Sequence, residues 1–470
     1  MQQDLHDWHS ENVVRLHISC DLADMADSTQ NDCNGSELHF FKDKTVFLTG
    51  ATGNLGGCLL FKLTVVLQVS KIYILCRGSA AEARSKLKKN MPKQLKSILA
   101  RKSVVFVVGD VMKPNFGICG KDLARMEEEV NIVINSAADI SLRASLESAI
   151  PKNCMPPLEL ARMATRFRRL KLFVQISTAY CNAHLPDGIV EERIYPLDDP
   201  EKELETFQRT GTNAQASRFP GGYYYSKHLM ERLLTTRHPD LPVLLVRPSI
   251  IGEAVHQPYE FYGPLGSCPI TTFLGFYMYE PGNATWYVRR DSGRISGTNI
   301  LDIVPVDWVA NLVLLHTVDN KRGVIHASAE SYGLLTFDEL IARVQDPNQE
   351  ECRAARFFKI ATRDWRFSNK ASTHLKSNEG PLSIKNDNHD IIEQLVPTMT
   401  RVTILVKRAK RIARWRNLVK GKIGQPLRLI SGQRAVLKSA GYSSQSSSTG
   451  AESDVVDMAQ KAEMSVVIVK

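Results

Sequence analysis

The chain contains six short apolar runs, separated by stretches with helical character. They are rich in Val, Ile, Leu and Phe and span residues 45–49, 71–76, 104–108, 131–135, 172–176 and 243–246. Near-continuous apolar strands that alternate with helices are typical of a parallel sheet buried on both faces. The sequence therefore predicts an α/β fold built on a doubly wound parallel sheet.

The other segments predict how the chain is organised around this sheet. Residues 1–40 are polar and acidic, and we expect a loose leader rather than a secretory or mitochondrial signal. Residues 41–340 would form the sheet domain, in which the aromatic segment 252–304 would be a small substrate-binding lid. Residues 341–431 would form a divergent, basic helical region, and the Ser/Gly-rich residues 432–470 a flexible tail.

The net charge of +10 is concentrated in one late stretch. Twelve Lys or Arg and no Asp or Glu lie between Arg401 and Lys438, so the rest of the chain is nearly neutral. This distribution argues against a nucleic-acid-binding body. Within the stretch, residues 398–422 mix cations with apolar side chains, which suits either a helix on an anionic membrane surface or a solvated helix face.

Targeting and metal signals are missing from the sequence. It has no run of eighteen apolar residues, and its nine cysteines are scattered without CxxC spacing. Scattered thiols are typical of a reducing compartment, and we expect no metal site. The protein is expected to be cytoplasmic, either free or peripheral on an intracellular membrane.

A glycine-rich turn follows the first apolar run and opens a helical stretch. Its glycines have the spacing GxxGxxG. Glycine permits a tight turn and a close approach of the backbone to a pyrophosphate, and a helix N-terminus presents free N–H groups to it, as in Rossmann folds. We therefore expect a dinucleotide to bind to Thr49, Gly50, Thr52, Gly53, Asn54, Leu55 and Gly56.

The ends of the next three runs indicate which dinucleotide binds. The second run ends at Arg77, where an NAD site usually has an acidic residue, and a guanidinium can pair with a 2′-phosphate. This favours NADPH, although a solvated arginine is the alternative. Asp110 and Val111 follow the third run and could meet the adenine, while the small Ala137 and Ala138 follow the fourth and would let the cofactor lie against the sheet.

Tyr223 and Lys227 are four residues apart, so on a helix they share one face. A phenol has a pKa of about 10, and a nearby ammonium lowers it. Such a phenol can act as a general acid toward a carbonyl oxygen. The alternatives are Tyr224 with His228, Tyr225, or a structural tyrosine over a surface lysine.

Two hydroxyl residues stand at the end of the fifth run. Either could donate a hydrogen bond to an oxygen that becomes an alkoxide during reduction. Thr178 is the first candidate and Ser177 the second. An ordinary turn at the end of a strand is the alternative for each.

With these motifs in order, the chain resembles the fatty acyl-CoA reductases (the male-sterility family) and the related thioester reductase domains. Both belong to the extended short-chain dehydrogenases. The resemblance runs from about residue 41 to residue 340. It rests on VFLTGATGNLGG (46–57), YILCRG (73–78), VVGDV (107–111), VINSAAD (133–139), QISTAYCN (175–182), YYYSKHLME (223–231), LLVRPSIIG (244–252) and DIVPVDWVAN (302–311).

The resemblance implies an activity and roles for individual residues. The activity would be reduction of an acyl thioester by NADPH to an aldehyde with release of thiolate, and a second reduction would give a primary alcohol. The catalytic residues would be Thr178, Tyr223 and Lys227. The nicotinamide would be bordered by Pro248, Ser249 and Ile250.

The substrate would be a long-chain or polyketide-type acyl thioester. Its chain would lie against aromatic residues of segment 258–279, unless these form a core or a plain lid: Tyr259, Phe261, Tyr262, Phe273, Phe276, Tyr277 and Tyr279. Other interpretations are a carrier-bound thioester, a dehydrogenase of a sterol, sugar nucleotide or small ketone, and a non-catalytic NADP-binding, membrane-associated interaction protein. The chain departs from the family pattern after Asn153, where Pro156 and Pro157 are expected in a first helical turn.

Overall fold

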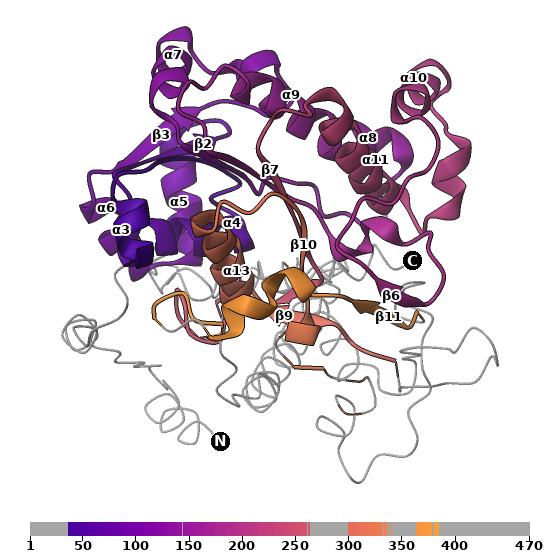
Figure 1. The fold of residues 1–470 in the computed structure, drawn as a ribbon. Coiled ribbons are helices and arrows are strands. Elements are labelled where there is room, and N and C mark those ends of the chain that lie inside the picture. Colours follow the sequence, from indigo (N-terminus) through magenta and orange to yellow (C-terminus); the bar gives the residue numbers. More distant parts are fainter. Residues whose placement is uncertain are drawn as a thin grey trace, which may run out of the picture.

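Seven parallel strands form the central sheet, in the order β10-β7-β5-β4-β1-β2-β3 (Figure 1). The strands are β1 (Thr45–Thr49), β2 (Lys71–Cys76), β3 (Val104–Val108), β4 (Ile132–Asn135), β5 (Leu172–Ile176), β7 (Val243–Pro248) and β10 (Gly323–Ala327). The order reverses at β1, as in doubly wound sheets. The predicted fold class is confirmed, and β10 is a strand that the sequence did not reveal.

The computed structural model describes most of the sheet domain and part of the later chain. Its described residues are 36–142, 144–260, 262–263, 299–331, 333–334, 336, 339, 363–377 and 380–384. The expected leader, the basic segment 398–422 and the Ser/Gly-rich tail lie outside these residues and stay predictions.

Helices cover both faces of the sheet (Figure 1). Successive side chains of a strand point to opposite faces, so Val46 and Leu48 enter one core and Phe47 the other. The first core is shared with α3 (Ser36–Lys42), α4 (Asn54–Phe61), α5 (Ala80–Asn90), α6 (Gln94–Ala100) and α13 (Val306–Val318). The second is shared with α7 (Gly120–Glu129), α8 (Leu146–Asn153), α9 (Met155–Ala164) and α11 (Gly222–Arg237).

Local sequence signals explain where two of the helices begin and end. Pro156 and Pro157 lie in the first turn of α9, as expected, because a proline there loses no intrahelical hydrogen bond. The polar stretch after residue 200 forms α10 (Pro200–Thr210) and the 3₁₀ turn η4 (Ala214–Arg218). The Asp199 side chain caps α10, which ends at Gly211 with a φ of 71°.

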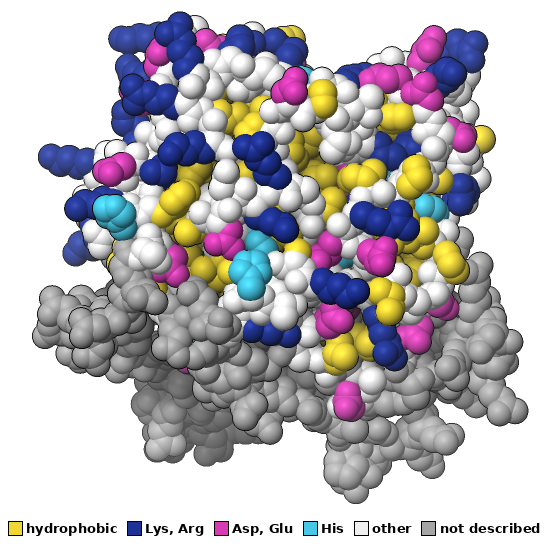
Figure 2. Space-filling view, in the orientation of Figure 1, with side chains coloured by type: hydrophobic (Ala, Val, Ile, Leu, Met, Phe, Trp, Pro, Cys, Tyr) yellow, Lys and Arg dark blue, Asp and Glu magenta, His cyan; other side chains and the backbone are white. Residues whose placement is uncertain are grey.

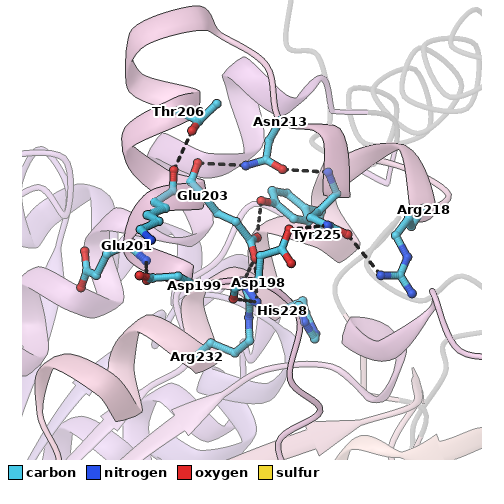
Figure 3. Close-up of polar contacts among 12 residues, drawn as sticks. Asp198, Asp199, Glu201, Glu203, Thr206, Asn213, Arg218, Tyr225, His228 and Arg232 are labelled. Carbon is cyan, nitrogen blue, oxygen red and sulfur yellow. Dashed lines mark hydrogen bonds and ion pairs between the residues drawn. The ribbon is translucent and has the colours of Figure 1, made fainter.

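Buried polar contacts fasten α10 to α11 (Figure 3). The Tyr225 hydroxyl donates to a Glu203 carboxylate oxygen at 2.7 Å. Arg232 forms a buried ion pair with the same carboxylate, and the Asn213 amide donates to the Glu203 carbonyl at 3.0 Å. α10 is therefore held to α11, the helix that carries the predicted proton donor Tyr223.

Strands that are distant in the sequence pair in two small additional sheets. β6 (Gly188–Val190) pairs in parallel with β11 (Trp365–Phe367), and η6 (Lys370–Ser377) follows. β8 (Ile250–Gly252) pairs with β9 (Ile303–Pro305). Residues 363–377 and 380–384 fall in segment 341–431, which we expected to be a divergent helical region, and Trp365, Phe367 and Leu382 of this segment are buried in the two cores of the sheet domain.

Charges are mixed on the face drawn in Figure 2, where Lys and Arg side chains alternate with Asp and Glu. No helix of the described residues is long and apolar enough to cross a membrane. Within the same residues, no three His, Cys, Asp or Glu side chains are grouped as metal ligands would be.

Candidate active site

The glycine loop between β1 and α4 is closely packed against its neighbours. Gly50 has a φ of 72°, a conformation that side chains disfavour, and a Cβ on it would lie 2.7 Å from the Ser136 carbonyl carbon. A Cβ on Gly56 would lie 2.1 Å from the Gly50 oxygen. The loop thus needs glycine at both positions, and it leads into the first turn of α4, whose N–H groups suit an anion.

A chain of buried polar side chains joins the strand ends beside this loop. The Thr49 hydroxyl donates to the Asn135 side-chain oxygen and accepts from the Ala137 N–H at 3.1 Å. The Asn135 amide then donates to Gln175 at 2.8 Å. Two predicted cofactor residues, Thr49 and Ala137, are therefore brought together, and the chain of contacts fixes the carboxyl edge of β1, β4 and β5.

The other predicted cofactor residues lie at the same edge. Arg77 follows β2 and is exposed, as a group that meets a phosphate should be. The Asp110 carboxylate follows β3 and accepts from the Met112 N–H at 3.0 Å, so one of its oxygens already shapes the turn. Val111 is half-buried and Ala138 is exposed. Their contacts with a cofactor stay predictions.

Tyr223 and Thr178 meet at the carboxyl end of β5. Tyr223 lies in the first turn of α11 and is buried. The Thr178 side chain lies close enough to its phenol to lower the pKa of Tyr223. Thr178 caps the 3₁₀ turn η3 (Ala179–Asn182) by accepting from the Tyr180 N–H at 3.3 Å. Ser177 is buried beside it, and its N–H donates to the Val246 carbonyl of β7 at 2.7 Å.

The pKa of Tyr223 differs from the expectation. Burial raises it to about 12, although the nearby Thr178 side chain acts in the opposite direction. The expected lowering by Lys227 is not found, because the Lys227 ammonium donates to the Ile176 carbonyl at 3.2 Å. The phenol therefore keeps its proton at neutral pH, which suits a proton donor.

Lys227 lies one helical turn after Tyr223 and is buried. Burial lowers its pKa to about 8, and the negative charge of Glu231 opposes this shift. The ammonium thus stays mostly protonated at pH 7. The two predicted residues share the face of α11 that is turned toward the end of β5.

The alternatives considered for the proton donor have other contacts. Tyr225 points to Glu203 of α10 (Figure 3). Tyr224 packs edge-on against Tyr223, with ring centroids 5.4 Å apart. His228 contacts the Asn182 side chain at 3.2 Å. The geometry therefore favours Tyr223.

One buried ion pair at the site was not identified from the sequence. Arg247 at the end of β7 is fully buried, and its Nε donates to a Glu231 carboxylate oxygen at 3.0 Å. The thiol of Cys181 in η3 lies 3.4 Å from the same carboxylate. The pair connects β7, α11 and η3, the elements that surround Lys227. In the sequence the pair is visible only as one arginine in LLVRPSIIG (244–252) and one glutamate in YYYSKHLME (223–231).

The residues expected beside the nicotinamide end β7 and begin β8. Pro248 and Ser249 are buried, and Ile250 is half-buried. The Asp302 carboxyl, which lies close to Ser249, accepts from the Ala329 N–H at 2.7 Å. Burial raises the pKa of Asp302 to about 6 although this hydrogen bond acts in the opposite direction.

We predict that Asp302 makes the folded state less stable as the pH rises. Its pKa is about 6 when folded and near the ordinary 3.8 when unfolded. The folded state therefore holds the extra proton, and stability should fall by about 3 kcal/mol between about pH 4 and 6. Urea unfolding at several pH values would measure this for wild type and Asp302→Asn. Equal pH dependence in both would contradict it.

The expected acyl-binding aromatic residues are only partly described. Tyr262 is fully buried behind the glycine loop, and the Tyr259 hydroxyl bonds to the Asn90 carbonyl at 2.7 Å. The hydroxyls of these two are turned toward Asn90 and the glycine loop, which favours the alternative that they belong to the core, and their contact with an acyl chain stays a prediction. The other five lie outside the described residues: Phe261, Phe273, Phe276, Tyr277 and Tyr279.

The chain is similar in sequence to known proteins. Residues 48–313 match the family model described as male sterility protein. The Drosophila melanogaster fatty acyl-CoA reductase wat is 30% identical over 309 residues, which is 60% of this chain and 56% of that protein. Human fatty acyl-CoA reductase 2 is 27% identical over 298 residues, 58% of this chain and 54% of its own length. This chain thus spans less than two thirds of either relative.

Solved structures with a similar arrangement include the terminal R domain of the myxalamid biosynthetic pathway. It is 24% identical, has a TM-score of 0.48, and the match covers 64% of this chain and 69% of that one.

Proposed function

Because this chain belongs to the male sterility protein family, we propose that it reduces a fatty acyl thioester to an aldehyde or a primary alcohol, with NADPH as the reductant. The observation that carries the proposal is that Tyr223 and Lys227 share one face of α11, turned toward the end of β5 and Thr178, at the sheet edge beside the glycine loop. The relatives named as fatty acyl-CoA reductases support the acyl substrate.

The residues of the chain fit a bound dinucleotide. Backbone atoms occupy the space that a Cβ on Gly50 or Gly56 would fill, so only glycine allows the tight turn that leads into α4, whose first N–H groups can meet a pyrophosphate. When bound, the nicotinamide supplies a hydride to the carbonyl carbon. Pro248, Ser249 and Ile250 would border it.

The polar residues of the site would transfer a proton to the substrate carbonyl oxygen and stabilise the charge that develops on it. Tyr223 would donate its phenolic proton to the carbonyl oxygen as negative charge develops there. Thr178 would donate a second hydrogen bond to the same oxygen. The Lys227 ammonium would hold the carboxyl end of β5, just before Thr178, in place by donating to the Ile176 carbonyl. The hemithioacetal would then return its hydroxyl proton to the Tyr223 phenolate, expel thiolate and leave the aldehyde.

Arg77 underlies the choice of NADPH over NADH. An exposed guanidinium after β2 can pair with the 2′-phosphate that only NADPH carries. We predict that Arg77→Ser raises the KM for NADPH about ten- to a hundredfold and changes that for NADH little, since hydrogen bonds to charged groups contribute about 1.5–3 kcal/mol. If the preference for NADPH over NADH were unchanged in Arg77→Ser, another group would have to bind the 2′-phosphate.

The activity is tested by incubating the protein with NADPH and a panel of acyl-CoAs. We expect oxidation of NADPH, release of free thiol, and an aldehyde or alcohol identified by mass spectrometry. Turnover of acyl groups only on a carrier protein would favour a carrier-bound thioester. Turnover of ketones alone would refute thioester reduction.

A lipid substrate would suit an enzyme at a membrane surface. We propose that residues 398–422 attach to anionic lipid, because they combine cations with apolar side chains. Liposome co-sedimentation of a chain that ends near Asn388 would test this, and undiminished binding would contradict it.

A further inference from the structure

Tyr262 lies against the back of the glycine loop, on the side opposite the predicted pyrophosphate. It is fully buried, and its hydroxyl contacts the carbonyl oxygens of Gly53 at 3.2 Å and Asn54 at 3.1 Å. A Cβ on Gly57 would lie 2.2 Å from this hydroxyl oxygen. Little space therefore remains for these peptides to shift toward the tyrosine.

The two carbonyl groups belong to peptides whose other ends matter for binding. The Gly53 carbonyl shares a peptide plane with the Asn54 N–H, and the Asn54 carbonyl with the Leu55 N–H. In a planar trans peptide the C=O and N–H bonds point in opposite directions. The Gly53 carbonyl also accepts from the Gly57 N–H at 3.0 Å, and the tyrosine hydroxyl is an additional donor behind these carbonyls, which helps to aim both N–H groups forward and polarises the two peptides.

A second tyrosine supports the loop from the same segment. The Tyr259 hydroxyl donates to the Asn90 carbonyl at 2.7 Å, and the Asn90 side chain donates to the Thr52 carbonyl at 3.0 Å. The rings of Tyr259 and Tyr262 meet edge to face with centroids 5.4 Å apart. The three consecutive carbonyls of residues 52–54 are thus held directly or indirectly by this tyrosine pair.

The tyrosine pair is itself firmly placed. The Asp307 carboxylate at the start of α13 accepts from the N–H groups of Val255, His256 and Gln257, at 2.9 to 3.2 Å. The buried Lys62 ammonium donates to the Gln257 side chain at 2.7 Å. Residues 255–257 are therefore bound to α13 and to the π-helical turn (Lys62–Val66) that follows α4.

We propose that Tyr262 is a positioning residue for the dinucleotide, which orients the Asn54 and Leu55 N–H groups toward the pyrophosphate. Tyr259 and Asn90 assist it through Thr52. This inference rests on the proposed function, since it presumes that the loop binds NADPH. It also gives Tyr259 and Tyr262, which lie in the segment that the sequence suggested for acyl binding, a role in binding the dinucleotide.

The test removes one hydroxyl and compares two ligands by titration calorimetry on the full chain. NADPH contains the pyrophosphate, whereas adenosine 2′-monophosphate contains the adenine and 2′-phosphate without it. In Tyr262→Phe we expect the Kd for NADPH to rise about tenfold, because one buried hydrogen bond is lost. The Kd for adenosine 2′-monophosphate should change by less than about twofold.

Two further variants separate positioning from stability. Tyr195→Phe removes another buried hydroxyl, which accepts from the Glu191 N–H at 2.9 Å away from the loop, and it should leave both affinities unchanged. Asn90→Ala should raise the Kd for NADPH about threefold, because it removes only the hydrogen bond to the Thr52 carbonyl. Thermal unfolding of each variant shows whether it is folded.

The outcomes are distinct. An unchanged Kd for NADPH in Tyr262→Phe would overturn the inference, and so would equal weakening of both ligands, which would indicate general loosening. If Tyr262→Phe does not fold, Asn90→Ala decides in the same way. A wild-type protein that binds no NADPH would refute the proposed function itself.

Discussion

Replacing Tyr223 by Phe is expected to lower kcat by a factor of about 10² to 10⁴, the range for loss of a general acid. The change removes only the hydroxyl that lies close to Thr178, and the ring stays in its buried position. The measurement is single-turnover oxidation of NADPH with the best acyl-CoA of the panel.

The neighbouring Tyr225 offers a matched control. Tyr225→Phe removes a buried hydroxyl from the same helix, but that hydroxyl bonds to Glu203 of α10 (Figure 3). Its kcat should stay within about threefold of wild type, while its stability falls by about 1.5–3 kcal/mol, because the acceptor is a carboxylate. If Tyr223→Phe kept more than a tenth of the wild-type rate, another group would have to donate the proton.

The second large effect is expected on stability. Arg247→Met should lower the free energy of unfolding by about 3–5 kcal/mol, because it leaves the Glu231 carboxylate buried without its cation. Urea unfolding measures this. The double variant Arg247→Met/Glu231→Leu removes both charges and should be more stable than the single variant.

An exposed pair supplies the comparison for this prediction. The Arg168 and Glu128 side chains form an ion pair at 2.9 Å but are 73% and 53% exposed. Arg168→Met should change stability by less than about 1 kcal/mol, because water screens the pair. A double variant at 247 and 231 no more stable than Arg247→Met would contradict the account of the buried pair.

The sheet could be predicted where each strand is a local apolar run, and the six predicted strands match within a residue or two. β10 was missed because its sequence, GVIHA, contains a histidine. His326 is buried there because its ring contacts the Ser368 carbonyl at 2.8 Å, 42 residues later. β6 and β11 were missed for a similar reason, since each has three residues and depends on the other.

The candidate site could likewise be predicted only in part. Tyr223 and Lys227 could be recognised because helix geometry alone places them on one face. The Arg247–Glu231 pair could not, since a buried charge has a meaning only once its partner is known. The location of Tyr262 was also beyond prediction, because nothing local indicates that its segment returns to the glycine loop.

The pairing of β6 with β11 has a consequence for synthesis on the ribosome. The Trp365 indole donates to the Pro186 carbonyl across 179 residues of chain. At a translation rate of about 5–20 residues per second, roughly 10–35 seconds pass between the emergence of these two residues. Throughout that interval the exposed strand at Gly188–Val190 has no neighbour on this side, and a nascent chain with an open strand edge can pair wrongly. A chain that ends before Trp365 would lack both β11 and the indole that donates to the Pro186 carbonyl, so β6 would have no strand partner.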